Sequence, residues 1–197
     1  MIDYFIALLP ALFLGFMSIV LVAQGGDDRQ KTLGTLGGAF LFSALATPFI
    51  DVHWTTKTLL ISFLSGLILG FGQYLQILCL KVLGVSRTMP LTTAGQIIFM
   101  CLGGIILFGE MNHGLALVFA LSSIALLTLG VVFISKTEKT AEAAEENVDW
   151  KRGTILLVVS TTCLVAYLLI VQGFGLDGRS VILPQSVGYF LVGLIAT

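Results

Sequence analysis

The sequence predicts an all-α membrane protein of about seven transmembrane helices. Of its 197 residues, 57% are hydrophobic and only 11% are charged, and the mean hydropathy is +1.03. An ordinary soluble domain carries about 25% charged residues, so this chain could not cover a surface that faces water. The composition therefore excludes a water-soluble enzyme and a disordered chain. The net charge of -1 offers no basic patch, which excludes a nucleic-acid binder.

Seven apolar runs follow one another, separated by short polar or glycine-rich breaks. A helix across the membrane needs about 20 residues, and no run shows the alternation of a barrel strand. We expect spans at about residues 4–23, 32–50, 58–80, 88–109, 114–135, 153–172 and 180–197. The chain begins Met1-Ile2-Asp3, without the basic region of a cleaved signal, so the first run is expected to stay in the mature protein.

The basic residues all lie in the breaks and predict the orientation. The odd-numbered breaks hold eight of them: Arg29, Lys31, Lys81, Arg87, Lys136, Lys139, Lys151 and Arg152. The even-numbered breaks hold only Lys57 and Arg179. Because basic loops stay in the cytoplasm, we expect a multi-pass protein of the plasma membrane with its N-terminus outside. Arg87 is expected to anchor its loop or to pair with lipid phosphate.

The tryptophans and cysteines are interpreted as structural residues and not as parts of a binding or metal site. Trp54 and Trp150 fall beside span ends, where indole rings anchor a helix at the membrane surface. Cys79, Cys101 and Cys163 lie inside apolar runs without the spacing of a metal site or a redox pair, so each is interpreted as a buried thiol. No cofactor and no metal site are expected.

An internal repeat divides the chain. Residues 25–29 match 175–179 in the pattern G-x-D-x-R, and further identities continue with the same offset to the end of the chain. We expect a first five-helix repeat at 1–135, a charged cytoplasmic linker at 136–152, and the start of a second repeat at 153–197. Because five spans are an odd number, the second repeat enters the membrane from the opposite side, as in many secondary transporters. The second repeat would lack three spans, so we expect a truncated form of a ten-helix protein.

Polar side chains within the spans are the candidates for substrate binding. Gln73 and Gln76 are three residues apart in the third span, and Thr92, Thr93 and Gln96 follow in the fourth. A carboxamide both donates and accepts, which suits the hydroxyl groups of a neutral solute. The alternative is that these side chains form hydrogen bonds between helices or, for threonine, to their own helix.

Acidic residues are absent from the middle of the spans. Glu110, at the end of the fourth span, comes nearest, and His53 and His113 lie at span ends. A cation exporter of the small multidrug resistance kind needs an acid in its first helix, which this chain lacks. If transport is coupled to a proton, Glu110 is the candidate.

Glycines and prolines predict how the helices pack. Gly34 with Gly38 and Gly66 with Gly70 form G-x-x-x-G pairs, which are typical of close packing within a bundle. Pro90 lies early in the fourth expected helix, where a missing N–H costs little.

Several motifs resemble the glucose/ribose porter family of the drug/metabolite transporter superfamily. They are ALLPA at 7–11, TLGT at 32–35, GVSRTMP at 84–90, FGE at 108–110 and the pair Gly72-Gln73. The resemblance implies a drug/metabolite transporter fold of inverted five-helix repeats, truncated here to about seven helices. It also implies uptake of sugars, with proton-coupled glucose uptake as the typical activity. The family usually has Trp-Gly-Ser in the first helix, where this chain has Leu14-Gly15-Phe16.

The resulting hypothesis is a secondary transporter that imports a sugar, glucose or similar, by alternating access. The sugar and the lipid bilayer are its partners, with a proton as a candidate coupling ion and a second chain as a candidate to complete the bundle. Two alternatives remain open, an exporter of small metabolites or amino acids and a non-transporting membrane subunit. An enzyme is not expected, because no span holds a nucleophile with a base.

Overall fold

The computed structural model describes residues 9, 12–13, 15–17, 20–21, 23, 25–52, 54–109, 114–141 and 149–196. This part of the chain is helical and contains no strand. Its elements are α2 (Asp28–Ala46), the 3-10 turn η1 (Thr47–Phe49), α3 (Thr56–Leu83), α4 (Val85–Phe108), α5 (Gly114–Ala141), α6 (Trp150–Gly173) and α7 (Gly178–Ala196). The described residues between 9 and 23 are helical too, where the first span was expected.

Five of these helices are long and apolar enough to cross a membrane: α2 with η1, α3, α4, α6 and α7. The segment Gly114–Gly130 of α5 is a shorter apolar helix. Large apolar side chains point outward, for example Phe42, Ile106 and Ile195, which are 72%, 74% and 78% exposed. This is the surface of a protein surrounded by lipid, and the predicted all-α membrane fold is confirmed.

Polar side chains fix where the helices begin. Asp27 caps α2, because its carboxylate accepts a hydrogen bond from the Asp28 backbone N–H at 2.9 Å. The Gln30 side-chain oxygen in turn accepts one from the Asp27 backbone N–H at 3.3 Å. Asp149 caps α6 by accepting from the Arg152 N–H at 3.0 Å. The two acids also place negative charge at the positive ends of the helix dipoles.

The break between α3 and α4 is a single residue, Gly84. Its φ of +80° lies where glycine is favoured, which lets the chain turn within one residue. The sequence predicted a longer break, with the helix resuming near residue 88. Since α4 begins at Val85, Pro90 lies inside the helix and removes the N–H that would bond the Ser86 carbonyl. Pro90 is early in the helix, as predicted, but it lies beyond the first turn, so the prediction that its missing N–H costs little is wrong.

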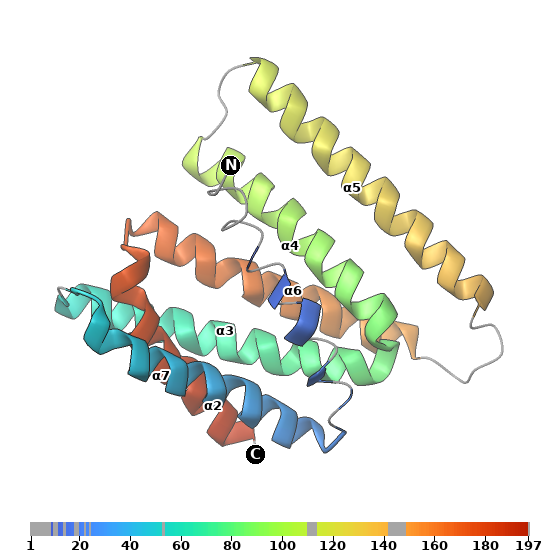
Figure 1. Ribbon diagram of the computed structural model, residues 1–197. Coiled ribbons are helices and arrows are strands. Elements are labelled where there is room, and N and C mark those ends of the chain that lie inside the picture. The colour runs from blue at the N-terminus through green and yellow to red at the C-terminus, as the bar shows by residue number, and fades with distance from the viewer. Residues whose placement is uncertain are drawn as a thin grey trace.

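α3 lies at the centre, with α6 and α7 packed along it. α4 packs against α6, α5 packs chiefly against α4, and α2 packs chiefly against α7. Figure 1 shows the resulting order, from α5 at one edge through α4, α6 and α3 to α2 and α7 at the other. The helix α6 therefore occupies the space between α3 and α4.

Glycines let α3 and α7 approach closely. A side chain at Gly66 would overlap the backbone of Gln185, and one at Gly188 would overlap the backbone of Phe63. The G-x-x-x-G pair of Gly66 and Gly70 therefore packs as predicted. The pair in α2 does not, because no described atom lies within 4 Å of a Cβ placed on Gly34 or Gly38.

α2 and α7 match in register at the offset that relates the two sequences. Each has 19 residues, and Gly25 and Gly175, which precede them by equal distances, both have a φ of +62°. The equivalent rings of Phe40 and Phe190 stack, with their centroids 4.8 Å apart and their planes 7° from parallel. Leu36 packs against Gly193, so the two helices are antiparallel. Antiparallel helices that meet through equivalent residues have the geometry of a local two-fold axis.

Candidate functional site

The two glutamines of α3 lie half-buried in the second half of the helix. Gln73 follows Gly70, which touches α7, by three residues, and Gln76 follows Gly72, which touches α6, by four. Such spacings keep residues on one side of a helix, so Gln73 lies toward α7 and Gln76 toward α6. Within the described chain no hydrogen bond engages either carboxamide. Both can therefore donate to and accept from a ligand.

The three predicted residues of α4 differ in environment. Thr92 is fully buried, and its hydroxyl donates to the carbonyl of Thr88 one turn earlier. Thr93 is exposed on the outer side of α4. Gln96 is half-buried, and its carboxamide has no hydrogen bond to another described residue. The helix thus offers one uncommitted carboxamide, while Thr92 has only its oxygen left as an acceptor.

α6 separates the polar groups of α3 from those of α4. Gly72 of α3 touches Cys163 and Leu164 on one side of α6, and Gly95 of α4 touches Thr161 on another. The structure therefore brings Gln73 and Gln76 together, and Thr92 and Gln96 together, but it does not join the two pairs in one pocket.

A set of hydroxyl and amide groups between α2, α3 and α7 was not predicted. The Gln185 side chain donates to the Ser65 hydroxyl at 3.2 Å, and the hydroxyl groups of Ser43 and Tyr189 lie 3.4 Å apart. These bonds join helices and so stabilise the bundle. The serines sit in apolar runs, and their number could have indicated a polar helix contact, but not which helices meet there.

At one end of the bundle α3, α4 and α6 converge. Arg87 is only 8% exposed, and its guanidinium lies over the Trp150 ring, 5.1 Å from the centroid. Thr88 donates to the Cys79 carbonyl at 3.2 Å, and the Cys79 thiol donates to the Gly153 carbonyl at 3.6 Å. Arg87 was expected in the break before the fourth span, anchoring the loop or pairing with lipid phosphate. The one-residue turn at 84 instead places it inside α4, buried against α6, so that expectation is wrong.

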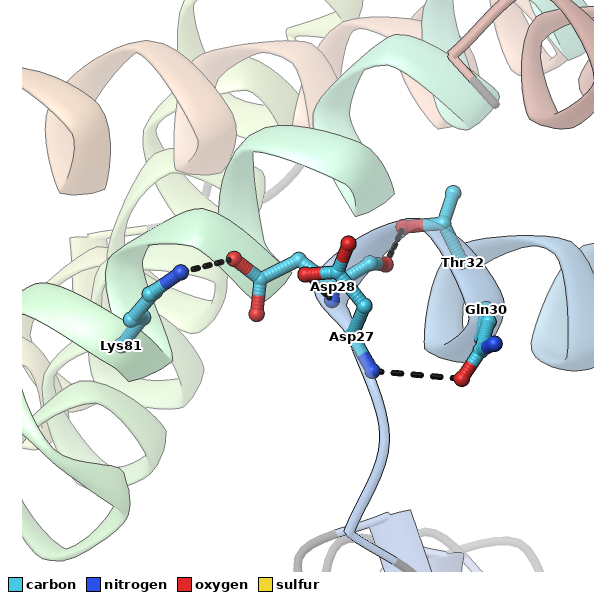
Figure 2. A network of polar contacts seen from close by, with 5 residues as sticks. All are labelled: Asp27, Asp28, Gln30, Thr32 and Lys81. Atoms are coloured by element: carbon cyan, nitrogen blue, oxygen red, sulfur yellow. Dashed lines mark hydrogen bonds and ion pairs between the residues drawn. The ribbon is translucent and has the colours of Figure 1, made fainter.

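The contacts of the charged residues show which of them lie at each end of the molecule. Figure 2 shows Lys81, at the end of α3, paired with Asp28 at the start of α2 through a 3.0 Å contact. Lys57, at the start of α3, lies over the Phe174 ring at the end of α6, 5.3 Å from its centroid. The basic breaks around Lys81 and Trp150 therefore share one end, and the break at Lys57 lies at the opposite end.

Some predicted residues fall outside the described chain. Glu110, the candidate for proton coupling, is among them, as are His53 and His113. Cys79, Cys101 and Cys163 are free thiols. In the part of the chain that the structure describes, no three His, Cys, Asp or Glu side chains gather as metal ligands would.

Comparison with known proteins shows similarity over the whole chain. The model of a family described as "Sugar transport protein" matches residues 5–197. A "Probable glucose uptake protein GlcU" of Bacillus cereus is 34% identical over 197 residues, which are 100% of this chain and 69% of the relative. The "Probable glucose uptake protein GlcU" of Priestia megaterium is 32% identical over 196 residues, 99% of this chain and 68% of the relative. The "Glucose uptake protein GlcU" of Bacillus subtilis is 31% identical over 195 residues, 99% of this chain and 68% of the relative.

The chain spans about two thirds of the length of these relatives. No solved structure matches it.

Proposed function

The chain belongs to the sugar transport protein family, and from that membership we propose that it imports glucose or a similar sugar across the plasma membrane. It is a multi-pass membrane protein of a family of transporters, not an enzyme. The observation that carries the proposal is the likeness to glucose uptake proteins along the entire chain.

Gln73, Gln76 and Gln96 bind the sugar hydroxyl groups in this proposal, with the buried Thr92 behind Gln96. The uncommitted carboxamides of the three glutamines support this role, since each can donate to one hydroxyl and accept from another. The exposure of Thr93 gives no support to the role expected for it. Because α6 lies between the two sets, the glutamines of α3 and the group on α4 engage the sugar at different stages of transport.

Alternating access between inverted repeats is the proposed mechanism. The repeats are residues 1–135 and the unit that begins at 153, joined by the linker 136–152. The matched bounds of α2 and α7, their antiparallel packing and the stack of Phe40 on Phe190 support this division.

The proposed orientation places the N-terminus outside and the basic end in the cytoplasm. The grouping of the basic breaks at one end supports it. Coupling to a proton through Glu110 and a second chain that completes the bundle belong to the same proposal.

The test is counterflow into liposomes that contain the purified chain. Vesicles are loaded with unlabelled glucose, ribose or another sugar, and entry of the labelled sugar is followed with and without a pH gradient. We expect glucose or a similar sugar to enter faster than mannitol, the control solute. Efflux of amino acids without exchange of any sugar would show an exporter instead, and no exchange at all would favour a non-transporting subunit.

A further inference from the structure

Two buried hydroxyl groups differ from all the others in the described helices. The other buried serines and threonines each make a hydrogen bond: Thr32, Ser43, Thr58, Ser65, Thr88, Thr92, Ser160, Ser180 and Ser186. The hydroxyl groups of Ser62 and Thr161 have no partner, although the two residues are 0% and 1% exposed. A buried polar group without a partner is rare and calls for an explanation.

The Thr161 hydroxyl does not make the bond to its own helix that a threonine usually makes. A threonine in a helix usually donates to the carbonyl four residues earlier, here that of Leu157. That carbonyl already accepts the Ser160 hydroxyl at 3.0 Å. Thr162, the next residue, is exposed and donates to the Val158 carbonyl at 2.8 Å. Thr161 lies on the side of α6 that packs against α4 at Gly95, a contact we call the α4 seam, and its hydroxyl has no partner.

The α4 seam holds a second uncommitted polar group. A Cβ placed on Gly95 would lie 3.0 Å from the Thr161 methyl carbon and 3.8 Å from its hydroxyl oxygen, so the two residues face each other. Gln96, the next residue on α4, is half-buried with a free carboxamide. An unpaired hydroxyl on α6 thus faces Gly95 of α4, and the next residue of α4 carries an unpaired carboxamide.

Ser62 does not present such a combination. It lies on α3 one turn before Gly66, where the backbone of α7 packs closely. The nearest carboxamide on α7, that of Gln185, is already bonded to Ser65. A ligand at Ser62 would therefore meet only one unpaired group.

We propose that the Thr161 hydroxyl is a sugar-binding group, which pairs with the Gln96 carboxamide to hold two neighbouring hydroxyl groups of the substrate. A valine has the shape of threonine and no polar group to bury, so packing alone gives no reason for the hydroxyl. The inference rests on the proposed function, because it takes a sugar as the ligand. It adds α6 to the helices that contact the substrate, and it places that contact on the side of α6 that faces α4.

The experiment compares T161V with the matched control T162V, which removes an exposed hydroxyl of the same helix. Both variants of the full chain are purified, and half-saturation by glucose is measured by counterflow. We expect T161V to raise the half-saturating concentration about tenfold, as the loss of one hydrogen bond does, and T162V to change it less than twofold. T161S, which keeps the hydroxyl, is expected to stay within about threefold of the parent chain.

Binding of a set of monodeoxy glucoses distinguishes a sugar-binding role of Thr161 from a purely structural one. The parent chain should bind one deoxy sugar about tenfold more weakly than glucose, and T161V should lose that discrimination because the same bond is already absent. The unfolding temperature of T161V should equal or exceed that of the parent chain. Should T161V fail to fold, T161A is measured by the same criteria.

Unchanged half-saturation in T161V, an equal effect in T162V, or retained discrimination among deoxy sugars would overturn the inference. If the parent chain shows no counterflow, the proposed transport function fails on its own. The inference is then judged by glucose-induced thermal stabilisation, which it requires in the parent chain and requires to be weaker in T161V.

Discussion

At the scale of single residues, the described interior combines a few apolar side chains, such as Leu36, Ile77 and Leu164, with many small and hydroxyl ones, and many bulky apolar side chains face outward. Among the residues that the structure describes, the largest fully buried side chains are threonines, serines and Cys79. Lipid is as apolar as leucine, so burying leucine adds little, and close contact between backbones stabilises the bundle instead. A larger polar side chain in this interior is therefore notable when its hydrogen bonds are unused, as in Gln73.

The replacement Gln73→Leu keeps a similar volume and removes both hydrogen-bonding groups. We expect sugar uptake to fall about 5- to 30-fold, because a carboxamide contributes about one to two hydrogen bonds of roughly 1 kcal/mol each to a hydroxyl ligand. Membrane abundance should stay the same, since no described residue bonds the carboxamide.

Uptake is measured with labelled glucose and abundance by immunoblot. Ser123→Ala is the control, because Ser123 is exposed on α5 and its hydroxyl bonds only the Phe119 carbonyl of its own helix. Uptake at the original rate in Gln73→Leu would remove Gln73 from the binding site.

At the scale of helices, the packing depends on where glycines meet a neighbour. The same motif has two outcomes in this chain. Gly66 and Gly70 touch α7, whereas Gly34 and Gly38 meet open space in the described structure. The crossing of α3 and α7 is therefore the contact most sensitive to added volume.

Gly188→Ala tests this crossing. The added methyl group would overlap the backbone of Phe63, which cannot yield as a side chain can. We expect a loss of roughly 1–3 kcal/mol, seen as a lower unfolding temperature in detergent. Gly38→Ala is the matched control and should be neutral or stabilising by up to about 1 kcal/mol, because alanine favours a helix more than glycine does. Equal effects of the two changes would contradict the described packing.

The contact between the starts of α4 and α6 gives a second prediction for the helices. Trp150→Ala removes the ring over which the buried Arg87 lies, so we expect a loss of about 0.5–2 kcal/mol. Trp54→Ala should change stability by less than about 0.5 kcal/mol, because Trp54 is 44% exposed and precedes α3. The measurement is thermal unfolding of both variants. A larger loss of stability in Trp54→Ala than in Trp150→Ala would contradict a stabilising role for the contact between Trp150 and Arg87.

At the scale of the whole molecule, the contacts define two ends with different charge. The basic breaks next to α2, α4 and α6 lie together, and Lys57 lies opposite. In addition, the equivalent helices α2 and α7 run in opposite directions and contact each other through equivalent residues, Phe40 and Phe190. Such a molecule can have only two orientations in a membrane, and the distribution of lysine and arginine favours one of them.

Cysteine labelling tests the orientation. In a background with Cys79, Cys101 and Cys163 replaced by alanine, we expect Lys151→Cys to react with an impermeant maleimide only in inverted vesicles. Arg179→Cys should react only in right-side-out vesicles, because Arg179 lies at the other end. The reverse pattern would place the N-terminus in the cytoplasm. Retained glucose uptake in each single-cysteine variant serves as the control for folding.

Sequence alone predicted the membrane fold and the offset at which the residues of α2 and α7 correspond, because apolar runs and a loop motif are local signals. It did not predict that these two helices pack against each other. It placed Arg87 outside its helix, since hydropathy cannot reveal that Gly84 turns the chain within one residue. It also could not show that α6 separates the polar groups of α3 from those of α4, because that depends on packing between distant segments. For the same reason it passed over Thr161, whose lack of a partner arises only in three dimensions.

The position of α7 has a consequence for how the protein is made. α7 packs against both α2 and α3, more extensively than those two pack against each other. Its polar contacts reach back 146 residues to Ser43 and 120 residues to Ser65. A ribosome adds about 5–20 residues each second, so α2 and α3 wait roughly ten seconds for the helix that joins them. During biosynthesis the face of α3 that carries Ser65 must therefore be covered by the insertion machinery or by another helix until α7 is made. A ribosome that stalls before α7 leaves this face uncovered.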